Sequence, residues 1–311
     1  MFPQHPVVLA PMAGGPATPA LVAAVPFGFL AAGYLSAAEL ERDMDELGDR
    51  AFGVNLFVPT PDDADPDAIA AYAERIGGDP ANARWSDDDW DAKLAVVQRR
   101  PPAVVSFTFG CPSRDVVASL ASEVWCTVTS VEEAAIAEAA GVDVLVAQGA
   151  EAGGHQSTFD DADGERTPML ELVRRIAGSL PVVAAGGIST RALVEAALEA
   201  GAVAAQIGTA FLLADEAGTS DPHRRALAGD GPTALTRAFS GRRARGIVNE
   251  FMREHDAHAP RGYPQVHYLT SPLRAKARAA GDAERINLWA GTGYRDAIAA
   301  PAAEIAASLT P

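Results

Sequence analysis

The residues best suited to chemistry in this chain follow a short apolar run, in the stretch AQGAEAGGHQS at positions 147–157. His155 stands there directly after Gly153 and Gly154. Histidine is the usual side chain for moving a proton near neutral pH, because its ordinary pKa lies close to that range. The neighbouring glycines would let a ligand come close to the backbone. The pattern predicts a catalytic histidine, and a structural histidine bonded to a loop carbonyl is the alternative.

Two glycine-containing turns further along are typical of an anion site. Gly186 and Gly187 follow the apolar run PVVAA, and the segment QIGT at 206–209 ends the next one. Glycines let backbone N–H groups approach an anion, and a helix beginning at Thr209 would add its positive end. Neither turn holds a lysine or arginine, so amides and the Thr209 hydroxyl would bind a phosphate. A simple tight turn at Gly186 and Gly187 is the alternative.

Two amide side chains stand at the ends of apolar runs. Asn55 lies in FGVNLFV and Gln148 follows DVLVA. Their polar groups could contact the edge of a flat heterocycle bound there, or they could only tie off a loop.

Other chemistries are excluded by the residues that are missing. A Schiff-base aldolase built on a β/α barrel needs a lysine on one of the strands. The only lysines, Lys93 and Lys276, lie outside every strand expected below. No cluster of histidines and carboxylates has metal-ligand spacing, so no metal site is expected. Arg242, Arg243 and Arg245 could clamp an anionic substrate or form surface salt bridges.

The elements that must position these residues alternate between short apolar runs and helical patterns, as in βαβ units. Eight strands are expected, at 7–10, 27–32, 52–58, 103–108, 124–128, 143–147, 181–185 and 203–207. Two βα units also resemble one another, TSVEEAAIAEAAGVDVLVAQG and STRALVEAALEAGAVAAQIG. The first begins with Ser130 and Glu133 spaced for a capping box. We therefore predict an α/β fold, a (β/α)8 TIM barrel, over an open doubly wound sheet. The chemistry of such barrels lies at the carboxyl ends of the strands.

Two regions depart from the alternation. Residues 60–102 are an acidic, proline-rich excursion expected to hold two helices, in which Asp87, Asp88 and Asp89 make a solvated helix start. The chain beyond about 215 is rich in helix and arginine. The expected division is a cofactor-binding barrel at 1–215, a helical cap at 216–275, and helices at 276–311 that pack back on the barrel.

The composition excludes several classes of partner. The chain has 311 residues, of which 48% are hydrophobic, and a net charge of −16. Nucleic acid and anionic membranes both need clustered cations, so neither is expected as a partner. Two cysteines build no disulfide framework, no apolar run is long enough to span a membrane, and the N-terminus does not resemble a signal peptide. A cytoplasmic protein is therefore expected.

Taken together, several stretches resemble the nitronate monooxygenase family, formerly called 2-nitropropane dioxygenases. The stretches are APMAGG, FGVNLFVP, VVSFTFGCP, VLVAQGAEAGGHQS, PVVAAGGI, AAQIGTAFLLADEAG, TRAFSGRRARGIVNEF, YPQVHYLTSPLR and LWAG. The resemblance covers nearly the whole chain and implies FMN as the cofactor. It implies that the phosphate lies on Gly187, Gly208 and Thr209, with Gln206 beside it, in the turns that also hold Gly186 and Ile207. The isoalloxazine and ribityl chain would lie among Met12, Asn55, Gln148 and Gly153, and His155 matches the active-site histidine.

The implied reaction is the FMN-dependent oxidation of an alkyl nitronate by O2 to a carbonyl compound and nitrite. His155 would hydrogen-bond the nitro oxygens, or remove the α-proton of a neutral nitroalkane. Relatives often have Gln where this chain has Thr292, in a loop expected to border the substrate. The alternatives are an FMN-dependent enoyl-thioester reductase using NAD(P)H and a flavin- or phosphate-binding barrel without catalysis. A homodimer through the helix-rich tail is also expected.

Overall fold

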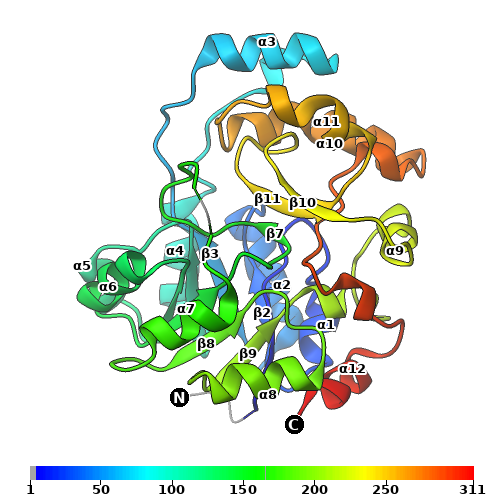
Figure 1. The fold of residues 1–311 in the computed structure, drawn as a ribbon. Coiled ribbons are helices and arrows are strands. Elements are labelled where there is room, and N and C mark those ends of the chain that lie inside the picture. The colour runs from blue at the N-terminus through cyan, green and yellow to red at the C-terminus, as the bar shows by residue number, and fades with distance from the viewer. Residues whose placement is uncertain (1–4, 165) are drawn as a thin grey trace.

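Eight parallel strands form a closed barrel in the computed structural model, which describes residues 5–164 and 166–311 (Figure 1). The strands are β1 (Val7–Leu9), β2 (Phe29–Ala31), β3 (Gly53–Phe57), β4 (Val104–Thr108), β5 (Glu123–Val128), β6 (Val144–Gln148), β8 (Val182–Ala185) and β9 (Ala204–Ile207). Their order is β1-β9-β8-β6-β5-β4-β3-β2. A parallel bridge from Leu9 to Gly28, with Leu9 N donating to Phe27 O at 3.0 Å, joins β1 to the start of β2. The predicted TIM barrel is confirmed, and the open-sheet alternative is wrong.

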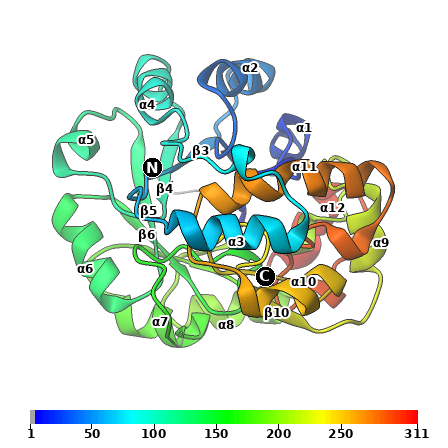
Figure 2. The ribbon, with the colours of Figure 1, turned by 90° about the horizontal axis from the view of Figure 1, so that it is seen from above.

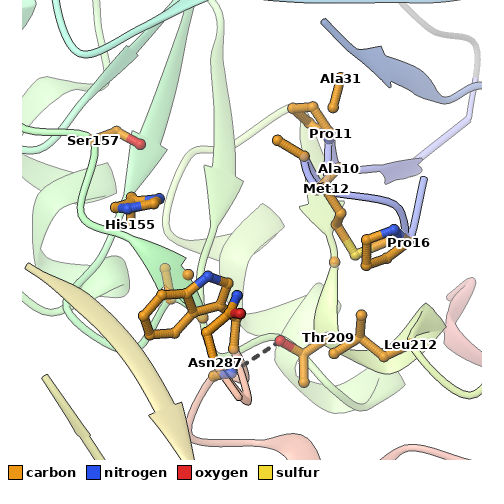
Figure 3. A pocket seen from close by; sticks show the side chains of 18 of the residues that line it. Ala10, Pro11, Met12, Pro16, Ala31, His155, Ser157, Thr209, Leu212 and Asn287 are labelled. Atoms are coloured by element: carbon orange, nitrogen blue, oxygen red, sulfur yellow. Dashed lines mark hydrogen bonds between the residues drawn. The ribbon is translucent and has the colours of Figure 1, made fainter. Parts of the chain in front are cut away.

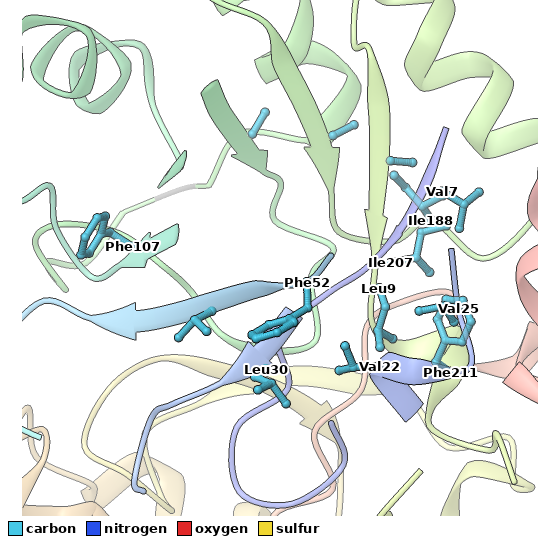
Figure 4. Close-up of a cluster of buried hydrophobic side chains, with 14 of the residues drawn as sticks. Val7, Leu9, Val22, Val25, Leu30, Phe52, Phe107, Ile188, Ile207 and Phe211 are labelled. Carbon is cyan, nitrogen blue, oxygen red and sulfur yellow. The ribbon is translucent and has the colours of Figure 1, made fainter. Parts of the chain in front are cut away.

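Both faces of this sheet are buried, which explains why its strands are continuous apolar runs. Val144 and Val146 of β6 point into the barrel, where they join a cluster around Trp125. Leu145 of the same strand belongs to the larger cluster between the strands and the surrounding helices. Figure 4 shows part of that outer cluster, where side chains of β1, β2 and β9 meet.

The helices that surround the barrel connect successive strands. They are α1 (Pro19–Ala23), α2 (Ala37–Leu47), α4 (Trp90–Arg99), α5 (Arg114–Ala118), α6 (Val131–Ala140), α7 (Met169–Ile176) and α8 (Arg191–Glu199). The capping box expected at α6 is half formed. Ser130 Oγ accepts from Glu133 N at 3.2 Å, but the Glu133 carboxylate accepts from Thr129 N instead, at 2.6 Å.

Most of the remaining elements form a cap over one end of the barrel (Figures 1 and 2). A small antiparallel sheet holds β10 (Thr233–Thr236), β11 (Ala244–Ile247) and β7 (Gly154–His155) in that order. Above it lie α3 (Pro66–Ile76), α10 (Glu250–His255) and α11 (Gln265–Ala279), with α9 (Asp221–Leu227) at the side. Short 3₁₀ turns complete the chain, at η1 (Pro80–Asn82), η2 (Thr209–Phe211), η3 (Asp256–His258), η4 (Ala283–Arg285) and η5 (Tyr294–Asp296).

The excursion at 60–102 holds the two expected helices, α3 and α4. The expectation of a solvated helix start is wrong for Asp88. Its carboxylate lies 2.7 Å from the buried ammonium of Lys93 and accepts a hydrogen bond from Tyr34 N at 2.8 Å. The hydrogen bond from Tyr34 ties the excursion to the loop after β2.

The C-terminal helix α12 (Ala302–Leu309) returns to the barrel, because Ile305, Ala306 and Leu309 join the outer core cluster. The domain boundaries at 215 and 275 stay a prediction. No helix within the described residues is long and apolar enough to cross a membrane.

Candidate active site

A cavity of about 340 Å³ opens at the carboxyl ends of the barrel strands, beneath the cap. All eleven residues selected from the sequence line it, although they come from widely separated segments of the chain. They are Met12, Asn55, Gln148, Gly153, His155, Gly186, Gly187, Gln206, Ile207, Gly208 and Thr209. In Figure 3, His155 and Ser157 lie across this space from Pro11 and Met12. The predicted residues therefore lie together, while the role of each stays a prediction.

His155 is held by the cap as well as by the barrel. It belongs to β7, whose pairing with β11 sets His155 opposite Ala244. Aromatic rings surround the imidazole, with centroids 5.5 Å away for Tyr263, 5.6 Å for Phe109 and 5.7 Å for Trp289. Its Nε2 lies 2.9 Å from the Ser240 hydroxyl.

The surroundings of His155 keep its ring neutral. Burial lowers the pKa of His155 to about 3, and the positive charges of Arg242 and Arg274 contribute to the same shift. A structural histidine bonded to a loop carbonyl is the alternative expected from the sequence. Among the described residues, the hydrogen-bond partner of the His155 ring is instead the Ser240 hydroxyl.

The two amide side chains are both held by hydrogen bonds, and Gln148 ends β6 as expected, whereas Asn55 lies in the middle of β3. Asn55 Nδ2 donates to Ser106 Oγ at 2.9 Å and to Thr108 Oγ1 at 3.0 Å. Gln148 Oε1 accepts from Ser157 N at 2.8 Å, so this residue does tie off the loop that follows His155. Both still line the cavity, and these bonds fix the direction in which each amide points.

Three buried polar atoms around the cavity have no hydrogen-bond partner among the described residues. They are Gln206 Nε2, Thr219 Oγ1 and His223 Nε2. Buried polar groups in folded proteins are nearly always paired. These atoms therefore fit a ligand that carries hydrogen-bonding groups of its own, such as a flavin.

The predicted phosphate cradle differs from expectation at Thr209. The chain forms the three-residue 3₁₀ turn η2 there and no α-helix, so the expected helix dipole is absent. The Thr209 hydroxyl accepts from Gly291 N at 3.0 Å, which leaves its own proton free to donate to an anion. A Cβ on Gly208 would make only ordinary van der Waals contacts, at 3.5 Å from Ala10 and Met12, whereas a Cβ on Gly187 would lie 2.6 Å from Glu151 Cβ.

The loop that carries Thr292 lies at this end of the cavity. Trp289 and Gly291 line the space, so the loop borders it as expected. Thr292 itself turns toward the cradle, because its N donates to Glu151 O at 3.0 Å and its hydroxyl stands beside Gly187. Trp289 is therefore the side chain of this segment that faces the proposed substrate position.

The cavity is positively charged, although the protein is acidic. None of the described residues that line it is aspartate or glutamate, whereas Arg274 and Arg278 do line it. Sequence reasoning missed Arg274 and Arg278, which share one face of α11 with His267. The spacing of seven and four residues between them is the helical signal that could have found them. Burial lowers the pKa of Arg274 to about 10, so it stays charged.

The arginine cluster at 242–245 does not line the cavity. Arg243 forms an ion pair with Asp163 at 2.7 Å. Of the two roles considered for this cluster, an anion clamp and surface salt bridges, Arg243 therefore has the second. Arg242 is buried, and its guanidinium lies 4.2 Å from the centre of the Phe109 ring. Arg245 Nε donates to the Ala150 carbonyl at 3.0 Å.

A closed barrel with a capped cavity at the carboxyl ends of its strands is the architecture of (β/α)8 enzymes. The half-buried His155 and the absence of carboxylates from the described lining fit an anionic ligand. The profile of the family described as nitronate monooxygenase matches residues 1–311, and the chain belongs to that family.

Two curated relatives are similar along nearly the whole chain. A nitronate monooxygenase of Pseudomonas aeruginosa is 41% identical, with 98% of this chain and 95% of that protein covered. One of Paraburkholderia phytofirmans is 40% identical, with 98% and 91% covered. The family and these relatives imply nitronate monooxygenase activity for this chain, and they set aside the alternative of a barrel without catalysis.

Two solved structures share the architecture. A nitroalkane oxidase from Streptomyces ansochromogenes superposes with a TM-score of 0.94 at 46% identity, covering 98% of this chain and 94% of that one. FabK from Thermotoga maritima gives a TM-score of 0.76 at 25% identity, covering 98% and 91%.

Proposed function

We propose that this enzyme binds FMN in the cavity and oxidises alkyl nitronates there. When bound, the flavin supplies the electron acceptor that nitronate oxidation needs, and O2 reoxidises it. The observation that carries the substrate proposal is the charge of the wall. A nitronate is an anion, and the described lining offers it two arginines but no carboxylate.

The residues that would hold FMN form two groups. The amides of Gly187 and Gly208 and the Thr209 hydroxyl would bind its phosphate. Met12, Asn55, Gln148 and Gly153 would surround its ring and ribityl chain. The unpartnered Gln206 Nε2 supports this assignment, because it is a buried donor that the flavin could satisfy.

The protein's own contribution would be to bind and orient the substrate. Arg274 would attract the anion, and this attraction is strong where water is excluded. The ring of His155 would contact the nitro group, walled in by Phe109, Tyr263 and Trp289. A nitronate is already deprotonated, so a neutral histidine suffices for it. The similar Streptomyces protein is a nitroalkane oxidase, which supports a neutral nitroalkane as a second substrate.

An anaerobic visible spectrum of the purified protein tests the proposal. The protein as isolated, or after adding FMN, should show oxidised flavin bands that are lost when propionate 3-nitronate is added. Bands that persist with the nitronate would contradict the proposal, as would a protein that binds no flavin.

The competing function expected from the sequence is the NAD(P)H-dependent reduction of an enoyl thioester. The same spectrum separates the two functions. A flavin that ignores the nitronate but is bleached by NAD(P)H, with NAD(P)H consumption on adding an unsaturated thioester, would favour the reductase.

A further inference from the structure

We propose that Ser240 is a positioning residue that fixes His155 as the tautomer protonated at Nε2, leaving the unprotonated Nδ1 as the atom offered to substrate. The inference rests on the proposed place of His155 in the active site. It adds a residue and a proton position to that site.

The argument begins with the single proton of the Ser240 hydroxyl. Ser240 Oγ lies 2.9 Å from His155 Nε2 and 3.0 Å from the carbonyl oxygen of Arg242, and Arg242 N lies 3.4 Å away. Ser240 and Arg242 are both buried, so water does not replace a missing bond there. The hydroxyl can donate to only one of the two acceptors.

The hydrogen bonds decide which acceptor receives the proton. If Ser240 donates to the Arg242 carbonyl, its lone pairs accept from His155 Nε2–H and from Arg242 N, and every group is paired. If it donates to His155 instead, the buried Arg242 carbonyl loses the only hydrogen bond that the described residues give it. A buried polar group without a partner is costly. The first arrangement is therefore favoured, and Nε2 carries the proton.

The turn that carries Ser240 is held in place by its backbone. Gly241 has φ of +75°, and a Cβ there would lie 2.6 Å from the Gly262 backbone. Gly241 N donates to Arg237 O at 2.8 Å, and Gly262 N donates to Gly241 O at 3.0 Å. The hydroxyl consequently has little freedom to follow another ring orientation. The backbone of the turn fixes the position of Ser240, and the imidazole of His155 is oriented by its hydrogen bond to that hydroxyl.

The opposite ring nitrogen is left for the substrate. No hydrogen bond within the described residues engages His155 Nδ1, and both His155 and Ser240 line the cavity. With a neutral nitroalkane, the Cα–H bond breaks and its electron pair delocalises into the nitro group, which gives the nitronate. The proton moves to Nδ1, while Nε2–H stays bonded to Ser240. Around this ring, the charged and titratable groups of the described residues are Arg242, Arg274, His267 and Tyr263.

Nitrogen-15 NMR of the histidine-labelled holoenzyme tests the tautomer directly. The His155 signals are assigned by their loss in His155→Gln. The wild type should show an unprotonated Nδ1 and a protonated Nε2. Ser240→Ala should give a mixture of the two tautomers, and Ser240→Thr, which keeps the hydroxyl, should restore the wild-type pattern. A proton on Nδ1 in the wild type, or an unchanged tautomer in Ser240→Ala, would overturn the inference.

Steady-state kinetics provide the second measurement. Ser240→Ala should lower kcat on neutral nitroethane at least tenfold more than kcat on its preformed nitronate, because only the neutral substrate needs Nδ1 as a base. Ser308→Ala, which removes a hydroxyl bonded only to a carbonyl of its own helix, is the control. Equal losses on both substrates in a flavin-loaded Ser240→Ala would contradict the positioning role. A wild type that ignores nitronates would refute the proposed function, and the NMR result would still decide the tautomer.

Discussion

At the scale of single residues, the chemistry depends on keeping His155 uncharged. Burial first, then Arg242 and Arg274, lowers its pKa to about 3. A lowered pKa means that the neutral ring persists as the pH falls, well below the ordinary histidine value of about 6.5. The kcat/KM for a preformed nitronate, which reports the free enzyme, should therefore show no titration near pH 6.5 from this residue. An acidic limb near that pH in the wild type that disappears in His155→Gln would contradict this prediction.

Replacing His155 itself separates its two proposed roles. His155→Gln keeps a hydrogen-bonding side chain but cannot act as a base. Its kcat on neutral nitroethane should fall about 10²–10⁴-fold, the usual contribution of general-base catalysis. The loss on the preformed nitronate should be much smaller. Stopped-flow flavin reduction with both substrate forms measures the ratio, and equal losses would exclude a base role.

Two glycines of the predicted phosphate cradle offer a matched pair of substitutions. A Cβ on Gly187 would meet Glu151 Cβ at 2.6 Å and force a side chain onto a φ of +72°, so Gly187→Ala should lower stability by about 1–3 kcal/mol. On Gly208 the nearest atoms to a Cβ are 3.5 Å away. Gly208→Ala should therefore fold normally and bind FMN more weakly.

Urea unfolding of the flavin-free protein and FMN titration measure these two effects. Normal FMN affinity in Gly208→Ala would remove that glycine from the phosphate site.

At the scale of the elements, the strand ends were predictable, and a cap was expected at 216–275, but the side chains that this part of the chain brings to the site were not. The residues at the ends of β3, β6, β8 and β9 follow apolar runs, and parallel strands bring their carboxyl ends to one edge. Ser240, Trp289 and Arg274 come from segments whose place over the barrel depends on long-range contacts. The sequence pattern of α11 shows a shared helix face but not what that face covers. Thr209 shows the same limit, because a glycine turn does not reveal how long the following helix is.

The face of α11 makes a testable contribution to binding. Arg274 is buried at the cavity, whereas Arg278, one turn further, is exposed. Because water and salt screen an exposed charge, Arg274→Met should raise the KM for a nitronate by about tenfold or more, and Arg278→Met by much less. Arg274→Lys should keep part of the affinity. Arg274 also donates to Thr270 Oγ1 and to Asn287 Oδ1, so circular dichroism and flavin content must show that each variant is folded.

Equal effects from the two methionine variants would show that the cavity attracts its substrate without a preference for the buried charge.

At the scale of the whole molecule, the buried histidines tie the stability of the fold to pH. Burial lowers the pKa of His155 to about 3 and of His223 to about 4, and it lowers that of His267 as well. The unfolded chain therefore binds more protons than the native one wherever the pH lies between these values and about 6.5. The contribution of these histidines to the free energy of unfolding should be fully present above pH 7 and should fall as the pH drops through 6 and 5. His155 and His223 each contribute a loss of about 2 kcal/mol between pH 7 and 5.

His223 is the best residue for this measurement, because its Nε2 lacks a partner among the described residues and it has no proposed role in catalysis. Urea unfolding at pH 7, 6 and 5 should give a flatter dependence for His223→Gln than for the wild type, whatever the change in stability at pH 7. His258→Gln removes an exposed histidine outside the cavity and is the control for loss of a histidine as such. Parallel curves for His223→Gln and the wild type would show that His223 has the same pKa in the native and the unfolded protein, and would remove it from the pH dependence of stability.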